Sequence, residues 1–357
     1  MAKLSKDYAS CSITYSDSGV ATVELKGASG GKFSGITCTG TKDSMNCRKI
    51  QTAAEILSMK VGEGGLIRDD HNELRYQGMT VDNYVTFNNE TWRIVGLFNV
   101  DGEQRVKLVR NDPLGYYSYD TSLCITSCIN RGYGINQWGP STYKNGTPYE
   151  GADLMRELNG DYLDTTLTSN TNWYNGMNDK KTAVFDHTKK LSSEAQKLID
   201  VATWYLGGST SISGSGASPT FVVNLATQYE NERGTKVVVP GTTCSGEDCN
   251  DNVVRTTIWT GKVGLIYASD IGYSSANANC KNNLTTNCNS WLKTGRFYWT
   301  ISPAADIAYR LFTSDAGGNV GYAATYLALE VRPSVYLIPG VQMNGSGTTA
   351  DPYIFTE

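Results

Sequence analysis

The feature of this sequence that most restricts its fold is the shortness of its apolar segments, which follow no alternating βαβ order. Strand-length runs such as 91–100 and 104–111 flank turn-forming residues, here Asp101-Gly102, and helix-like stripes are few. The 37 Gly and 22 Tyr among 357 residues favour turns, short strands and aromatic contacts. We therefore expect an α+β fold with two or three helices among mostly antiparallel short strands.

Local capping signals predict where the helices begin. A capping box formed by Thr52 and Glu55 predicts a short helix over about 53–60. A second box, 193–196, predicts a helix that runs on to Leu206 and ends at Gly207-Gly208. Between them, a helical stripe ending near Gly160 is formed by Leu154, Met155, Leu158 and Tyr162.

Strand alternation predicts which side chains face water. In the strand 104–111, Arg105 and Lys107 alternate with Val106 and Leu108, which predicts one wet face. The neighbours Tyr298 and Trp299 should point to opposite faces for the same reason. We expect a buried core that includes Trp92, Val331, Val335 and Leu337.

Residues 1–48 form a predicted small β-rich segment. Two strand candidates, about 11–16 and 20–26, flank the turn Asp17-Ser18-Gly19, and a stretch rich in Gly and Ser follows them. The predicted main domain spans 49–357.

Charge and composition exclude several partner classes. The net charge is −4 and only 18% of residues are charged, so the chain lacks the basic surface that nucleic acid requires. No run is long enough to span a bilayer, and the first eleven residues have no apolar segment of the signal-peptide kind. We expect a leader or a membrane or pilin anchor ahead of this chain in the native protein.

The nine cysteines indicate an oxidising compartment. Eight of them fall into sequence-local couples within polar loops, which is typical of surface disulfides in extracellular proteins. Cys11 is left over, either free or competing for a partner. The predicted disulfides join Cys38 to Cys47, Cys124 to Cys128, Cys244 to Cys249, and Cys280 to Cys288.

Signals for catalysis or metal binding are weak. His71 follows Asp69-Asp70 in what we interpret as a solvated turn, and His187 is interpreted as a surface histidine. Calcium ligation by Asp248, Asn250 and Asp251 lacks the spacing of a known calcium loop, and ordinary turn chemistry explains these residues better. We expect no cofactor and no metal site.

Six motifs occur in a fixed order along the chain: WRIV, LNGDYL, WTGKVGLIYASD, FYWTISP, VRPSVYL and NGSGTTADPYIF. In this order they resemble a family of secreted or surface proteins of Gram-positive gut bacteria with an uncharacterised C-terminal domain. The same layout resembles the C-type-lectin fold of the formylglycine-generating-enzyme type, which also occurs in the variable proteins of diversity-generating retroelements. That resemblance implies a ligand-facing surface over 298–328, closed by Glu330-Val331-Arg332-Pro333, where Glu330 replaces the usual Gly.

The composition of 301–329 agrees with adenine-directed diversification of Asn codons. The block contains no Lys, Glu, Gln, Met or Trp, although their chain-wide frequency predicts about four. A Gly- and Ala-rich pair of strands near the core explains the same composition, so both interpretations stay open. On the first, residues 304–312 and 322–326 should be mainly exposed. The expected ligand contacts are Tyr298, Ala304, Asp306, Tyr309, Arg310, Phe312, Tyr322 and Tyr326.

These observations predict a non-enzymatic ligand-binding or adhesion protein outside a bacterial cell, with a protein or glycan ligand on a cell or phage surface. Tyrosine suits such a surface because it offers large rigid contact area and a hydroxyl group. One alternative is a pilin-like structural subunit. A second is an oxidase of the formylglycine-enzyme type, which would need a reactive thiol at Cys280 or Cys288.

Overall fold

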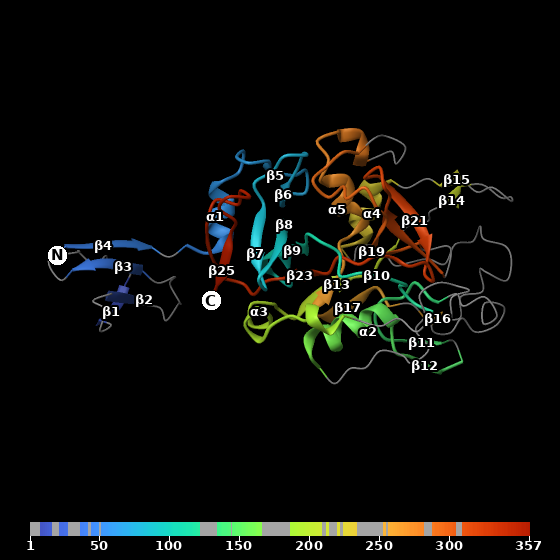
Figure 1. The fold of residues 1–357 in the computed structure, drawn as a ribbon, viewed down its shortest axis with the longest axis horizontal. Coiled ribbons are helices and arrows are strands. Elements are labelled where there is room, and N and C mark those ends of the chain that lie inside the picture. The colour runs from blue at the N-terminus through green and yellow to red at the C-terminus, as the bar shows by residue number, and fades with distance from the viewer. Residues whose placement is uncertain are drawn as a thin grey trace.

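The computed structural model describes residues 51–121, 134–143, 145–165, 186–208, 224–233, 256–281, 288–304 and 309–357, with backbone alone for residue 187 and for strands β1–β4 and β14–β16. In this part of the chain helices mix with many short strands that pair mostly antiparallel (Figure 1), which confirms the α+β class. The one parallel strand pair described joins β19 to β22.

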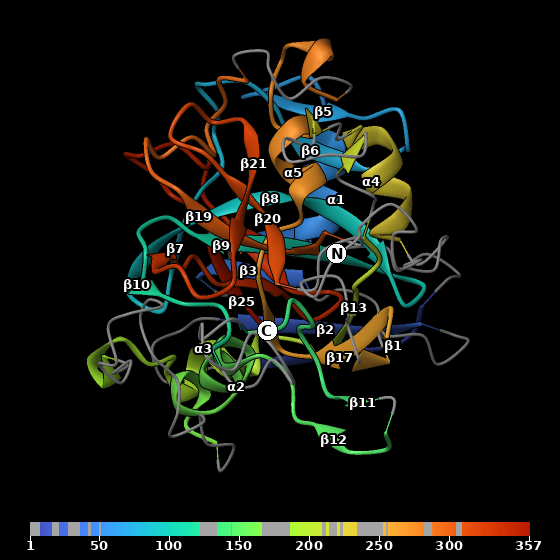
Figure 2. The same ribbon diagram turned by 90° about the vertical axis from the view of Figure 1, so that its right-hand side faces the viewer.

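Two sheets carry most of the structure. The larger has the order β18-β23-β9-β8-β6-β5, and β7 adds to β8. Its strands are β5 (Leu66–Arg68), β6 (Leu74–Tyr76), β7 (Tyr84–Phe87), β8 (Glu90–Val100), β9 (Glu103–Arg110), β18 (Val263–Gly264) and β23 (Ser334–Tyr336). The second has the order β10-β22-β19-β20-β21, with β10 (Tyr116–Tyr117), β19 (Tyr298–Pro303), β20 (Arg310–Ser314), β21 (Val320–Ala324) and β22 (Leu329–Glu330). In Figure 2, β19, β20 and β21 face the viewer.

Small sheets complete the strand inventory. The N-terminal strands form a separate four-stranded sheet in chain order, and each of the others has two or three strands. Their bounds are β1 (Tyr8–Tyr15), β2 (Ala21–Gly27), β3 (Ile36–Thr41), β4 (Ser44–Lys49), β11 (Ser141–Tyr143), β12 (Pro148–Tyr149), β13 (Ala202–Tyr205), β14 (Ile212–Ser213), β15 (Thr220–Phe221), β16 (Val253–Val254), β17 (Ile258–Gly261), β24 (Gln342–Asn344) and β25 (Ile354–Thr356). Four strands thus lie within residues 8–49, and the N-terminal segment as a separate β-rich unit stays a prediction.

The hairpin β8–β9 forms where the sequence predicts it. Asp101 and Gly102 have φ angles of 55° and 80°, the left-handed geometry of a tight hairpin turn. The predicted wet face of β9 is wrong, because Arg105 and Lys107 are buried, like every position of that strand from 105 to 110. The sheet is covered on both faces, so successive side chains of this strand point into protein on either side and not alternately into core and water.

In the part of the chain that the structure describes, five short α-helices lie among the strands, more than the two or three predicted: α1 (Ala53–Met59), α2 (Asp153–Asn159), α3 (Ser193–Lys197), α4 (Leu225–Asn231) and α5 (Ala268–Tyr273). The 3-10 turns η1 (Asp161–Leu163), η2 (His187–Lys189) and η4 (Ala278–Lys281) lie in the same described ranges. The capping box of Thr52 and Glu55 opens α1 as predicted. The helix predicted to reach Leu206 is wrong, because α3 ends at Lys197 and the chain then forms β13.

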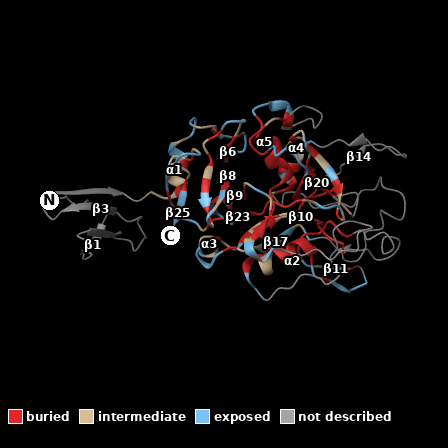
Figure 3. Cartoon of the chain, viewed as in Figure 1, coloured by how far each residue is buried: buried red, intermediate tan, exposed pale blue. Residues whose placement is uncertain are grey.

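The core contains large aromatic and aliphatic side chains from both main sheets. Figure 3 colours the buried residues of the chain red. Trp92, Val331, Val335 and Leu337 are fully buried, as predicted. Arg332 is buried beside them and donates hydrogen bonds to the backbone oxygens of Arg110 and Leu292. This arginine therefore holds two chain segments together.

Candidate functional site

The hairpin β20–β21 lies at the centre of the predicted ligand-facing block. Its strands pair in regular register, with Phe312 opposite Tyr322 and Arg310 opposite Ala324. β20 is buried from Leu311 to Ser314, whereas β21 alternates between buried and more open positions. The hairpin therefore has one rigid strand inside the protein and one strand at the end of the described sheet.

A compact turn joins the two strands. The Asp315 carboxylate accepts hydrogen bonds from the backbone N–H of Asn319, at 2.8 Å, and from its side-chain amide, at 3.2 Å. Gly318 adopts a φ of 82°, and a Cβ atom there would lie 3.0 Å from Cβ of Lys293. The turn thus requires glycine for both its backbone conformation and its close packing.

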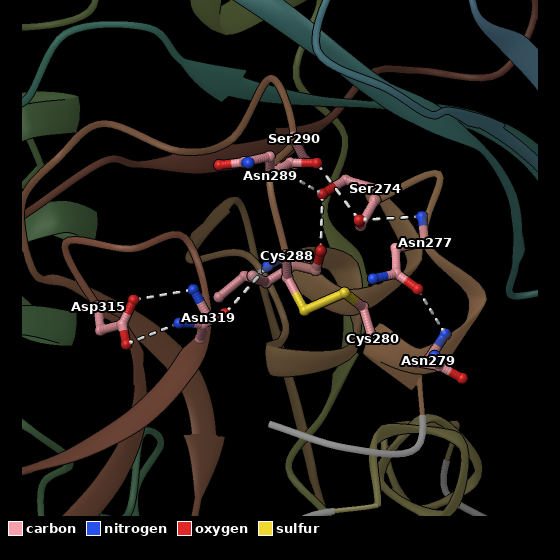
Figure 4. Close-up of a disulfide and its surroundings, with 11 residues drawn as sticks. Ser274, Asn277, Asn279, Cys280, Cys288, Asn289, Ser290, Asp315 and Asn319 are labelled. Atoms are coloured by element: carbon pink, nitrogen blue, oxygen red, sulfur yellow. Dashed lines mark hydrogen bonds between the residues drawn. A yellow bond between two sulfur atoms is a disulfide. The ribbon is translucent and has the colours of Figure 1, made fainter. Parts of the chain in front are cut away.

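The disulfide loop supports this turn (Figure 4). Cys280 and Cys288 are joined by a disulfide with their Cα atoms 5.7 Å apart, and both residues are buried. The backbone N–H of Cys288 donates to Oδ1 of Asn319 at 3.0 Å. The side chain of Asn319 therefore connects the disulfide to the hairpin turn through Asp315 (Figure 4).

An arginine and three tyrosines are the accessible members, among the described residues, of the predicted set of ligand contacts. The guanidinium of Arg310 lies 4.7 Å from the ring centre of Tyr322 and 5.6 Å from that of Tyr309. Tyr322 is 38% exposed, whereas Arg310, Tyr309 and Tyr326 are half-buried. We call these four residues the Arg–Tyr surface. Cation–π stacking of this kind holds an arginine in a defined orientation.

The rest of the predicted contact set does not reach the surface. Tyr298, Ala304 and Phe312 are almost fully buried, so the expectation that 304–312 and 322–326 are mainly exposed is wrong for the described residues. Every position of β19 is buried: the Tyr298 hydroxyl donates to the Leu292 oxygen, and the Trp299 indole N–H donates to the Tyr117 oxygen. Alternation therefore sends both residues into the protein interior.

Several predicted residues fall where the structure gives partial or no information. Strand pairing places Cys38 directly opposite Cys47 in the β3–β4 ladder, and their disulfide stays a prediction. The side chain of His187 lies outside the described residues, although its backbone begins η2. Also outside them are Asp306, Cys124, Cys128, Cys244, Cys249, Asp248, Asn250 and Asp251.

A buried group of paired charges is the main feature that sequence reasoning missed. Oδ1 of Asp270 accepts a hydrogen bond from Arg75 at 2.7 Å, and its Oδ2 accepts one from Lys107 at 2.6 Å. Arg75 also pairs with Asp69 at 2.7 Å and with Glu73 at 3.4 Å. Arg233 contacts the same Glu73 oxygen at 3.2 Å. We call these residues the charge cluster; it contains three cations and three carboxylates.

Aromatic rings line the charge cluster. Lys107 Nζ lies 4.0 Å from the ring centre of Tyr267, and Arg233 lies 4.1 Å from that of Tyr229. The sequence carried one signal for this arrangement: a lysine at the centre of the apolar run Val106-Lys107-Leu108-Val109.

The Asp69–His71 turn meets the charge cluster at its edge. Asp69 is buried, which corrects the interpretation of this turn as fully solvated. His71 is exposed, but its ring stacks on Tyr229 at 3.8 Å and its Nε2 lies 2.9 Å from the Tyr273 hydroxyl.

A second buried carboxylate, Glu232, lies between α4 and α5. It accepts hydrogen bonds from the Ser302 hydroxyl at 2.5 Å, from the Gln228 amide at 3.0 Å and from the Ser269 hydroxyl. Burial raises the pKa of Glu232 above its ordinary value, in spite of these donors.

Across the described ranges, no group of three or more His, Cys, Asp or Glu side chains is arranged to hold a metal ion. None of the helices in that part of the chain is long and apolar enough to cross a membrane. Comparison with protein-family models, curated proteins and solved structures found no match for this chain.

Proposed function

We propose that this chain is an extracellular ligand-binding protein that contacts a protein or glycan through the Arg–Tyr surface. The observation that carries the proposal is that the Arg310 guanidinium lies near the rings of both Tyr322 and Tyr309, at the start of a strand that is buried from Leu311 to Ser314. Arginine and tyrosine are enriched among residues that dominate binding energy, because they combine large area with directional hydrogen bonds. A rigid support lowers the entropy lost when such side chains bind.

The fold assignment belongs to this proposal. A C-type-lectin-like domain of the formylglycine-enzyme type agrees with the α+β class and with a ligand face late in the chain. Diversification by a retroelement is part of the same proposal, restricted to outward positions, because a packed core rejects random residues. A reverse transcriptase gene beside a near-copy of codons 300–333 that differs only at adenines would support it.

Two alternatives make different predictions. A pilin-like structural subunit should polymerise, which size-exclusion chromatography measures directly. A formylglycine-type oxidase needs a reactive thiol, whereas Cys280 and Cys288 are paired in a buried disulfide here. A thiol titration of the folded protein that finds either of them free would favour the oxidase.

The binding proposal is tested with purified protein on a printed glycan array and on immobilised mucin. The variant Arg310→Ala/Tyr322→Ala should lose at least tenfold in affinity for any probe that the native protein binds, equivalent to about 1.4 kcal/mol. Ile354→Ala is the matched control, since Ile354 is 53% exposed on β25, at the other side of the main body from β21 (Figure 1). Equal affinity of the double variant and the native protein for a bound probe would refute this surface as the contact site.

A further inference from the structure

The contact between Lys107 and Asp270 joins two distant parts of the chain. Lys107 lies in β9 of the larger sheet and Asp270 lies in α5, 163 residues later. Lys107 Nζ is 2.6 Å from Asp270 Oδ2, and the two side chains are 1% and 0% exposed. We propose that these side chains condense into an intramolecular amide bond, which cross-links β9 to α5. The proposal is independent of the ligand-binding function.

The geometry places the reacting atoms within reach of each other. Nζ of Lys107 already contacts Oδ2 of Asp270, and the carboxyl carbon is bonded directly to that oxygen. A small movement of Nζ would therefore bring it to the carbon that it attacks. Both groups are held by the fold, which replaces an encounter in solution by a preorganised one with a high effective concentration.

The surroundings of Lys107 exclude water. Its Nζ lies 4.0 Å from the ring centre of Tyr267, 5.4 Å from that of Trp204 and 5.5 Å from that of Tyr336. These rings are buried, so the amine and the amide product are shielded from hydrolysis. Burial, together with the nearby positive charges of Arg233 and Arg75, lowers the pKa of Lys107 to about 8 although Asp270 opposes the change. A fraction of the amine is therefore neutral and nucleophilic near neutral pH.

The surroundings of Asp270 suit the carbonyl of an amide. Arg75 donates at 2.7 Å to Oδ1, the oxygen that stays as the amide carbonyl, and the backbone N–H of Tyr267 donates at 3.0 Å to Oδ2, the oxygen that leaves. Burial alone would raise the pKa of Asp270, but the charges of Lys107 and Arg75 outweigh it and hold that pKa below its ordinary value. Proton transfer from the ammonium to the carboxylate removes the charge of Lys107. Arg75 then stabilises negative charge on Oδ1 when Nζ attacks.

The reaction balances without a further reagent. The Nζ–Cγ bond forms and the Cγ–Oδ2 bond breaks. Two of the three ammonium protons leave with Oδ2 as one water molecule, the third stays as the amide N–H, and no atom changes oxidation state.

The charge cluster contains equal numbers of cations and carboxylates both before and after the reaction. Condensation removes one cation and one carboxylate and leaves Arg75 and Arg233 with Asp69 and Glu73. A permanent buried ion pair would instead keep two desolvated charges, which are costly in a protein interior. The cross-link therefore relieves a desolvation cost without leaving an unpaired charge.

The test is the intact mass of the purified protein after incubation at pH 8, measured in denaturing and reducing conditions. The native chain should be lighter than its sequence by the mass of one water molecule, and protease digestion should yield one peptide pair joined through Lys107 and Asp270. An unchanged mass, with Lys107 and Asp270 found in separate peptides, overturns the proposal and needs no variant.

Two substitutions distinguish the Lys107–Asp270 amide from other modifications that also remove one water molecule. Lys107→Arg keeps the cation but cannot form the amide, so its mass should equal that of its sequence. Asp270→Asn should lose ammonia in place of water if it reacts. On a denaturing gel the native chain should migrate faster than Lys107→Arg, because a loop of 163 residues stays closed. A water loss that persists in Lys107→Arg would place the modification elsewhere and refute the assignment.

Discussion

Replacing Phe312 and Tyr322 separately by Ala measures how the β20–β21 hairpin divides between scaffold and surface. The two residues are direct cross-strand partners, so they occupy the same place in the ladder. Phe312 is 0% exposed and Tyr322 is 38% exposed. The pair therefore compares two aromatic truncations that differ mainly in burial.

The expected costs differ severalfold. Removal of a fully buried Phe ring costs about 3–5 kcal/mol, from lost transfer energy and the cavity left behind. Tyr322 loses its stacking on Arg310 at 4.7 Å and part of its packing, which together are worth about 1 kcal/mol at such a site. At roughly 2 °C per kcal/mol for a chain of this size, Phe312→Ala should lower the Tm by on the order of 6–10 °C and Tyr322→Ala by roughly 2 °C.

Thermal unfolding followed by tryptophan fluorescence provides the assay, with near-ultraviolet circular dichroism to verify native packing before heating. If Tyr322→Ala destabilises the protein as much as Phe312→Ala does, the division into a buried and an accessible strand is wrong. A native Tm for Phe312→Ala would contradict the placement of β20 in the core.

Three further predictions test other parts of the structure. Because the pKa of Glu232 is raised in the folded state, its contribution to stability is greatest below its unfolded pKa of about 4.3 and is lost as the pH rises through the folded pKa. Glu232→Gln should therefore flatten the decline of the unfolding free energy between acidic and neutral pH, measured by urea titration. An unchanged dependence of the unfolding free energy on pH would contradict this prediction. Gly96→Ala should destabilise the protein by about 3 kcal/mol, because its Cβ would lie 2.2 Å from the Leu74 oxygen. The Cβ of Gly102→Ala would meet no atom within 4 Å, so this variant should lose only about 1 kcal/mol, from its left-handed backbone conformation. Equal losses of unfolding free energy in denaturant would refute the steric explanation. Cys280→Ser/Cys288→Ser should lower the unfolding free energy by about 2.5 kcal/mol, the loop-closure value for this short loop, and reductant should then have no further effect at this site.

Local signals in the sequence predicted local structure well. The capping box of Thr52 and Glu55 and the turn Asp101-Gly102 need only neighbouring residues, so both form as expected. The burial of Trp92 and Val335 followed from their types alone.

Predictions that depended on the environment of a strand failed. Lys107 and Tyr298 were expected to follow alternation between core and water, but both main sheets are covered on both faces where these residues lie. The partner of Lys107 is 163 residues away, and nothing in a local window shows which distant carboxylate will meet it. The helix predicted to reach Leu206 failed for a similar reason, since Trp204 pairs with Trp259 of β17.

The unequal burial of the two hairpin strands limits how a combinatorial library could be built on this scaffold. Leu311, Phe312 and Thr313 are buried in succession, so randomised codons there would yield mostly unfolded clones. Gly318 disfavours other residues at the turn, because its φ is 82° and an added Cβ would lie 3.0 Å from Cβ of Lys293. The useful library positions are the Arg–Tyr surface together with Ala324, which is half-buried. New specificities from this hairpin would therefore come from exchanging a few large side chains on a fixed frame, and a broader repertoire would require the neighbouring loops to vary as well.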